Sequence, residues 1–153
     1  MKYYLNIGTN MGELRDNLYR AVVALAASTG SCAVSSVVES EPWGFESEHR
    51  FLNIGVSLDS PMPPMQMLER IHEIERHLGS AAHRDSEGRY IDRLVDIDIV
   101  AIDDLVIDTP TLQVPHPHLA ERDFFLKPMV ELAPAWRHPV TGLTASQMLE
   151  MLH

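Results

Sequence analysis

The sequence predicts an α+β protein in which an antiparallel sheet carries two helices on one face. Two observations predict it. Apolar residues alternate with period two in some segments and recur every three to four residues in others, and these segments follow one another as β-α-β-β-α-β. This order is the ferredoxin-like plan, here with extra C-terminal elements. The 153 residues are 45% hydrophobic, enough for a real core, so one domain is expected over residues 1–153.

The first strand and helix follow from local pattern. Lys2–Ile7 alternates and is rich in aromatic residues, which is typical of a strand, and Gly8–Asn10 follows as the strand-to-helix turn. A capping box formed by Asn10 and Glu13 is expected to begin the first helix. The helix is expected to end at Thr29, before Gly30.

The remaining elements are assigned in the same way. Strands are expected at 31–38, 51–58 and 94–102, and a helix between the prolines at 61–64 and Gly79. A short strand at 105–107 is expected to pair with the strand at 94–102, and a C-terminal helix covers 145–152. The polar segments 39–50 and 80–92 are expected to be surface loops.

Charge limits the partners of this protein. The 12 basic and 22 acidic residues give a formal net charge of −10, which disfavours nucleic acid and anionic membranes. The one cysteine, Cys32, allows no internal disulfide, and the chain contains no membrane-length apolar run or secretory signal, so a cytoplasmic location is expected. The protein is also expected to be a monomer. Several arginines fall between Arg84 and Arg122. A phosphate ligand is therefore expected there, bridged by a divalent metal.

The most unusual local feature is Asp96-Ile97-Asp98 in the middle of an apolar strand. Alternation places both carboxylates on one face of the sheet, roughly 6.5–7 Å apart at their Cα atoms. Two hard oxygen ligands at this separation could share Mg²⁺ with substrate phosphates. The alternative is an exposed acidic strand face.

A second feature is Val114-Pro115-His116-Pro117-His118, with Arg122 shortly after it. Prolines on both sides restrict the backbone of His116 and favour a fixed presentation to a ligand, such as donation to a phosphate oxygen. Zinc is disfavoured because the chain has one cysteine and no third ligand at finger spacing. A proline-stabilised turn with surface histidines is the alternative.

The third feature is the aromatic segment from Ser40 to Phe45, which leads into Phe51-Leu52-Asn53. Its rings, amide and carboxylate could hold a planar heterocycle by stacking and edge hydrogen bonds. From residue types alone, packing against the core is the favoured interpretation. Gly8-Thr9-Asn10 lacks both the P-loop and the Rossmann glycine spacing, and no nucleophile elbow is present.

Taken in order, these pieces resemble the 6-hydroxymethyl-7,8-dihydropterin pyrophosphokinase family, over most of the chain. The resemblance rests on an ordered set of segments: Ile7-Gly8-Thr9-Asn10, Glu41-Pro42-Trp43-Gly44, Phe51-Leu52-Asn53, Ile74-Glu75, Leu78-Gly79, Arg93 to Ile99, Leu112 to Pro117 and Arg122 to Pro128. It implies transfer of pyrophosphate from ATP to the hydroxymethyl oxygen of the pterin, with release of AMP.

The resemblance also implies roles for particular residues. Asp96 and Asp98 would ligate two Mg²⁺ ions, and Arg84 and Arg93 would complete the catalytic group. ATP would be bound by Glu75, Arg89, Arg93, Ile99, His116 and Arg122. The pterin would lie between Phe51 and Phe124, with Ser40, Trp43 and Asn53 at its polar edge, which reverses the core interpretation of the aromatic segment.

The loop between Gly79 and Arg93 departs from the family pattern. The family usually carries an arginine directly after the glycine, another two residues later, and a Trp-Gly-Pro before the last arginine. This chain has Ser80, Ala82 and Tyr90 at these places. An arginine shortly before the Val-Pro-His segment is replaced by Thr111. A pterin- or nucleotide-binding relative with weak or lost kinase activity is therefore the alternative function. An acidic interaction module would leave the carboxylates, His116 and Arg122 without a shared purpose.

Overall fold

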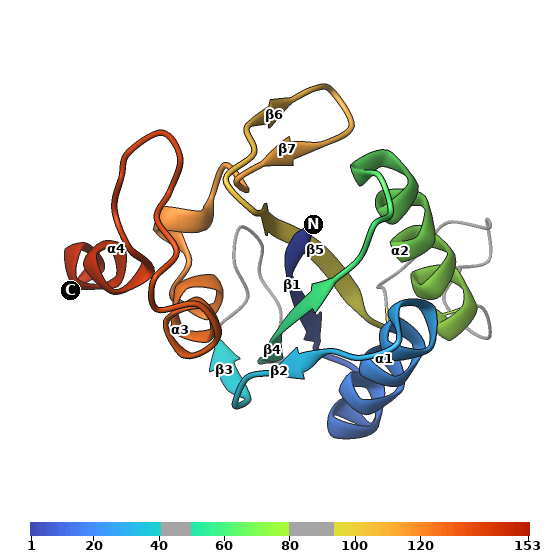
Figure 1. Cartoon of the computed structure of the whole chain (residues 1–153). Coiled ribbons are helices and arrows are strands. Elements are labelled where there is room, and N and C mark those ends of the chain that lie inside the picture. Colours follow the sequence, from blue (N-terminus) through green and yellow to red (C-terminus); the bar gives the residue numbers. More distant parts are fainter. Residues whose placement is uncertain (41–49, 80–93) are drawn as a thin grey trace.

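The computed structural model describes residues 1–40, 50–79 and 94–153. It confirms a mixture of helices and antiparallel sheet (Figure 1). Strand β1 (Lys2–Thr9) lies between β4 (Phe51–Asp59) and β5 (Asp96–Ile102). Two short strands, β2 (Ala33–Val34) and β3 (Val38–Ser40), both pair with β4. Within the described residues, β5 therefore has a sheet neighbour on one side only.

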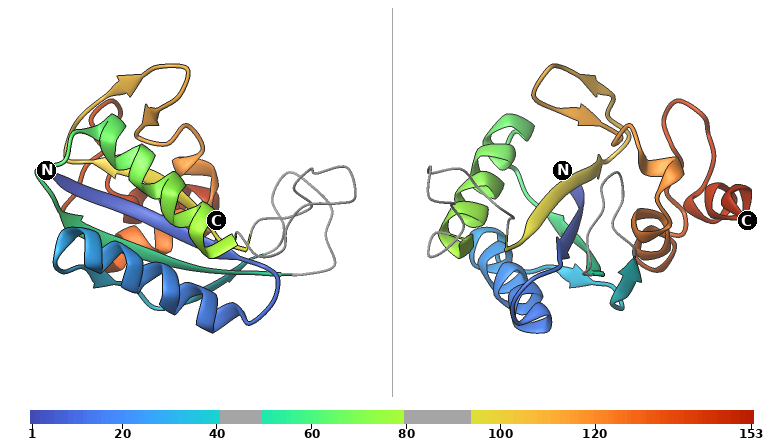
Figure 2. Two further views of the ribbon diagram at one scale, coloured as in Figure 1. Left: turned by 90° about the vertical axis from the view of Figure 1, so that its right-hand side faces the viewer. Right: turned by 180° about the vertical axis from the view of Figure 1, so that it is seen from behind.

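Helices cover both faces of the sheet (Figure 2). On one face, α1 (Leu14–Thr29) and α2 (Pro64–Gly79) lie side by side. On the other, α3 (Asp123–Leu132) packs on β4 and contacts α4 (Ala145–Leu152). A short 3₁₀ helix, η1 (Leu119–Glu121), leads into α3.

Alternation along β1 divides its side chains between two cores. Tyr3, Leu5 and Ile7 are almost fully buried in the larger core, beneath α1 and α2, while Tyr4 belongs to the second core with α3 and α4. Each such apolar side chain contributes about 1.5–3 kcal/mol through burial. Asn6 and Gly8 share the face of Tyr4, so that face becomes polar toward the end of β1.

The predicted strand at 31–38 is wrong, because it is broken into β2 and β3. The reason lies at Ser35, whose backbone N–H donates to the Gly55 carbonyl while its hydroxyl accepts from the Gly55 N–H at 2.8 Å. A side-chain oxygen therefore takes the place of a backbone carbonyl in the ladder, and regular pairing is interrupted between the two strands.

The predicted capping box at the start of α1 is also wrong. The helix begins at Leu14, and the Glu13 side chain forms no cap hydrogen bond. Gly12 has φ +75°, a left-handed turn that moves Asn10 out of the cap position. The turn is held instead by Asn17, which donates to Thr9 Oγ1 and to the Met11 carbonyl.

Two expectations around β5 need correction. A register shift against β1 between Tyr4 and Leu5 places Val100 in a β-bulge, so Ala101 joins the second core although strict alternation predicts the Ile97 face. The expected strand at 105–107 does not pair with β5. Instead β6 (Ile107–Asp108) pairs with β7 (Gln113–Val114) in a separate hairpin.

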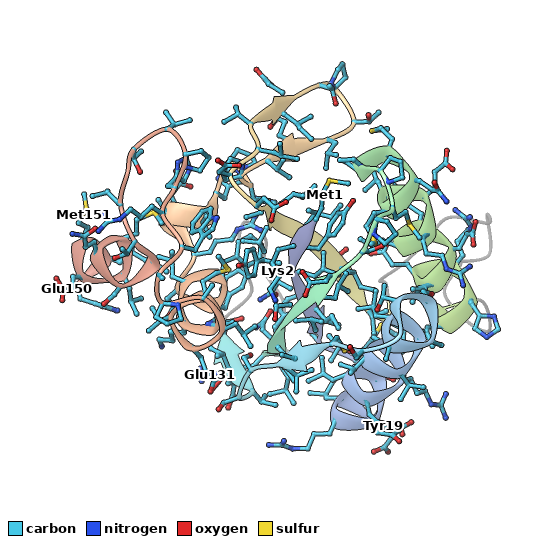
Figure 3. The ribbon with its side chains drawn as sticks, in the orientation of Figure 1. Met1, Lys2, Tyr19, Glu131, Glu150 and Met151 are labelled. Atoms are coloured by element: carbon cyan, nitrogen blue, oxygen red, sulfur yellow. The ribbon has the colours of Figure 1, made fainter. Side chains whose placement is uncertain are left out.

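Helix α3 approaches the sheet closely at Gly55. A Cβ on Gly55 would lie 2.4 Å from Pro128 Cβ, so the contact requires glycine. Glu131, labelled in Figure 3, fixes the same helix by accepting from the Ser36 N–H and hydroxyl. No helix in the described part of the chain is long and apolar enough to cross a membrane.

Candidate active site

The carboxylates of Asp96 and Asp98 lie on one face of β5, as predicted. In the register with β1, Asp96 is opposite Gly8 and Asp98 is opposite Asn6. Asp96 is exposed and Asp98 is half-buried, while the intervening Ile97 is buried on the other face. Two anions are therefore held side by side at the edge of the sheet. This donor set suits Mg²⁺, which commonly takes one or two protein carboxylates plus phosphate oxygens.

Glu75 of α2 fixes the backbone between these two carboxylates. Its Oε2 accepts from the Ile97 N–H at 2.8 Å. Because this N–H donates to Glu75 of α2, it lies on the side of β5 that faces away from β1. Glu75 thus lies at the predicted site, with a bond to the strand that carries the metal-binding candidates.

A cavity of about 370 Å³ opens along the outer edge of β5. Its walls come from α2, β5, the β6–β7 hairpin and the segment after β7. They are formed by Leu68, His72, Glu75, Asp96, Ile97, Asp98, Ile99, Pro110, Thr111, Leu112, Gln113, His116 and Pro117. The structure therefore brings together five of the residues predicted for metal and ATP: Glu75, Asp96, Asp98, Ile99 and His116.

His116 reaches this cavity as a neutral hydrogen-bond donor. The His118 N–H donates to His116 Nδ1 at 3.1 Å, so the ring proton is on Nε2. Burial, then the nearby Arg122 and His118, lower the pKa of His116 to about 4. Phe125 supports the ring edge-on at 5.0 Å, and the His116 N–H donates to the Val100 carbonyl in the bulge. The fixed presentation expected from the sequence is present.

Arg122 lies between the acidic strand and the aromatic residues at the start of α3. Its guanidinium carbon is 5.6 Å from the centre of the Phe124 ring and 5.0 Å from that of Phe125. Burial lowers the pKa of Arg122, and the attraction of Asp98 and Asp96 opposes this. Such a partly buried cation beside two carboxylates is well placed to receive a phosphate.

A second polar group lies on the same face of the sheet, across β1. Asn53 on β4 donates from Nδ2 to Ser40 Oγ at 2.8 Å and to the Val38 carbonyl at 3.3 Å. A Cβ on Gly8 would be 3.0 Å from Asn53 Oδ1 and 3.6 Å from Phe51 Cδ1. The missing side chain at Gly8 therefore leaves room beside the amide oxygen and the ring.

Phe124 approaches this group from α3. It lies in the first turn of α3, which packs on β4, and its carbonyl accepts from Asn6 Nδ2 at 2.9 Å. The four described residues predicted for the pterin are thus contributed by β3, β4 and the start of α3. The predicted residues Trp43, Arg84, Arg89 and Arg93 lie outside the described residues.

Sequence reasoning missed two residues of this region. His72 lines the cavity one turn before Glu75, and the i, i+3 spacing of two polar side chains on α2 was the available signal. Asn6 is 2% exposed and lies directly opposite Asp98. A buried amide inside an apolar strand was the signal there.

Paired carboxylates, a partly buried arginine and a donor histidine beside a cavity are typical of a metal-dependent enzyme that transfers a phosphate group. Its second substrate would occupy the polar and aromatic group across β1. The model of the 7,8-dihydro-6-hydroxymethylpterin-pyrophosphokinase family matches residues 4–134. The chain belongs to this family.

Individual relatives agree with this assignment. The chain is 39% identical over 138 residues to the 2-amino-4-hydroxy-6-hydroxymethyldihydropteridine pyrophosphokinase of Porphyromonas gingivalis, covering 89% of this chain and 92% of the relative. The Aquifex aeolicus enzyme of the same name is 35% identical over 137 residues, covering 90% and 83%.

The fold is similar to that of Plasmodium falciparum HPPK-DHPS in its crystal structure with pteroate. The TM-score is 0.76 at 15% sequence identity, and the match covers 98% of this chain. It covers only 42% of the Plasmodium chain, so this chain spans less than half of that protein.

Proposed function

We propose that the protein transfers the pyrophosphoryl group of ATP to the hydroxymethyl oxygen of 6-hydroxymethyl-7,8-dihydropterin, in folate biosynthesis. One observation carries the proposal: Gly8 pairs with Asn53 on one side and with Asp96 on the other. Strands are about 4.8 Å apart, so Asn53 and Asp96 lie about 10 Å apart across an open glycine. A small heterocycle in this space has its polar edge at Asn53 and its reactive group near the carboxylates.

On the nucleotide side, ATP occupies the cavity beside β5. Asp96 and Asp98 would hold the metal, with two Mg²⁺ ions expected, which when bound would supply positive charge near the transferred group. His116 donates from Nε2 to a phosphate oxygen, and Arg122 supplies planar donors to another. Ile99 offers edge backbone groups to the base, because β5 has no described neighbour on that side.

On the pterin side, Asn53 Oδ1 accepts from the donor edge of the ring. Both Nδ2 hydrogens of Asn53 are engaged, which fixes which atom faces the ligand. Phe51 and Phe124 stack on the two faces of the heterocycle, and Ser40 supports the amide. Trp43 contributes backbone groups.

In the reaction, the hydroxymethyl oxygen forms a bond to the β-phosphorus, and the bond from that phosphorus to the oxygen bridging the α-phosphate breaks. AMP leaves with that oxygen, and the hydroxyl proton passes late in the step to water or a nearby carboxylate. The protein mainly holds the two substrates in line and excludes alternative geometries. Arg84, Arg89 and Arg93 are proposed to add positive charge.

The fold-level proposal is the βαββαβ ferredoxin-like plan. The strand order β2-β4-β1-β5, together with α1 and α2 on one face, supports it. The carboxylates then fall on the edge strand, where a nucleotide can reach them.

The decisive experiment measures AMP release by the purified protein with ATP, Mg²⁺ and the pterin. We expect pterin-dependent AMP at catalytic turnover, and none with the pterin or Mg²⁺ omitted. Tight pterin binding without AMP would instead favour the alternative, a binding relative that has lost the chemistry. A parallel fluorescence titration of the pterin without ATP measures pterin binding separately from turnover.

A further inference from the structure

Helix α3 contains a carbonyl whose usual donor, four residues later in the helix, is missing. Pro128 lies inside the helix and has no N–H. The carbonyl four residues earlier, that of Phe124, therefore loses its intrahelical donor. Asn6 Nδ2 donates to this carbonyl at 2.9 Å. A side chain from the central strand thus replaces the hydrogen bond that proline removes.

Asn6 also lies between the two strands that carry the proposed site. Asn6 is 2% exposed, and in the sheet it is paired with Gly55 on β4 and Asp98 on β5. Pro128 packs against the sheet at Gly55. The proline that removes the donor to the Phe124 carbonyl therefore also sets the distance between this carbonyl and Asn6. One residue therefore contacts α3 at Phe124 and lies opposite the carboxylate on β5.

We infer that Asn6 is a positioning residue for the reaction: it holds the first turn of α3 so that the Phe124 ring keeps a fixed place relative to Asp98. This inference rests on the proposed function, in which Phe124 stacks on the pterin and Asp98 holds the metal. Asn6 touches neither substrate. It fixes the relative placement of the aromatic wall and the metal-binding strand.

The effect of removing Asn6 follows from the chemistry of the orphaned carbonyl. In Asn6→Ala, the partly buried Phe124 carbonyl loses the Asn6 donor, and the first turn of α3 shifts to find another partner. Phe124 moves with that turn, whereas the cavity between α2 and β5 is built from other elements. The loss therefore falls mainly on the pterin and on turnover, with a smaller effect on ATP through Arg122, the N-cap of the same helix.

The experiment combines Asn6→Ala with Pro128→Ala. Asn6→Ala should raise the pterin KM about tenfold and lower kcat, with a much smaller change in the ATP KM. Pro128→Ala restores an N–H that can donate to the Phe124 carbonyl and keeps the Cβ that contacts Gly55. The effect of Asn6→Ala should therefore be several-fold smaller in the Pro128→Ala background. Asn6→Leu, which fills the volume without a donor, should behave like Asn6→Ala.

Trp136→Phe is the matched control, because it removes another side-chain donor to a backbone carbonyl, that of Asp103, outside the site. It should lower the melting temperature without changing the pterin KM. The inference is overturned if Asn6→Ala leaves the pterin KM unchanged, raises both KM values equally, or shows the same effect in both proline backgrounds. If the wild-type protein releases no AMP, the proposed function fails. The pterin Kd of each variant relative to wild type, measured by fluorescence, then shows whether Asn6 positions Phe124.

Discussion

Gly8→Ala tests whether Asn53 Oδ1 accepts a hydrogen bond from the pterin. The new methyl would lie 3.0 Å from Asn53 Oδ1 and 3.6 Å from Phe51 Cδ1. Ordinary carbon-to-oxygen contacts are about 3.3–3.6 Å, so Oδ1 must retreat by roughly 0.3–0.6 Å. A hydrogen bond accepted there would lengthen from about 2.9 Å beyond 3.2 Å and lose most of its strength. At about 1–1.5 kcal/mol, the loss corresponds to a pterin KM raised about tenfold.

The assay is steady-state AMP release with each substrate varied in turn, and fluorescence titration of the pterin. The ATP KM should be unchanged, because the cavity beside β5 gains no atom. Asn53→Ala provides the control: if Gly8→Ala acts through the amide, the double variant should bind the pterin as weakly as Asn53→Ala alone. An unchanged pterin KM in Gly8→Ala, or fully additive losses in the double variant, would refute the reasoning.

Three further predictions follow. Asp98→Ala should abolish turnover, because it removes a metal-binding carboxylate, whereas Asp104→Ala, at an exposed carboxylate outside the site, should leave turnover unchanged. Full activity in Asp98→Ala would disprove the metal site. The pKa of His116 is lowered from 6.5 to about 4, so the unfolded chain binds more protons between these values and stability falls as pH falls through this window. Denaturant titrations should show a free energy of unfolding about 1–2 kcal/mol lower at pH 5 than at pH 7, after allowance for the partial exposure of His116. This difference should be absent in His116→Phe. An equal change in unfolding free energy with pH in both proteins would contradict the prediction. Gly55→Ala, whose Cβ would meet Pro128 Cβ at 2.4 Å, should destabilise the protein by about 1–3 kcal/mol, and an unchanged melting temperature would show that α3 can yield there.

Sequence reasoning located the acidic strand because its signal is local. Two carboxylates at i and i+2 share a strand face whatever the sheet around them, so Asp96 and Asp98 could be placed together before any tertiary contact was known. His116 was predicted from the prolines on both sides of it for the same reason. The tautomer was not predictable, since it depends on a hydrogen bond from His118 that forms only in the folded turn.

The errors arise where a dihedral angle or a contact between strands overrides residue type. The capping box and the strand at 31–38 were read from residue type, but the left-handed turn at Gly12 and the side-chain ladder bond of Ser35 decide the backbone there. Both devices require a partner or a dihedral angle that composition does not reveal. The bulge at Val100 depends likewise on the register with β1.

The sequence by itself determined most element types, the acidic strand and the family, because periodicity and ordered motifs are properties of the chain alone. Only the tertiary structure decided which residues of different elements contact one another. It showed that Gly8 lies between Asn53 and Asp96, that Glu75 holds the Ile97 backbone, and that Asn6 satisfies a carbonyl left free by Pro128. These contacts join residues 22 to 118 positions apart, and strand register and helix packing bring them together.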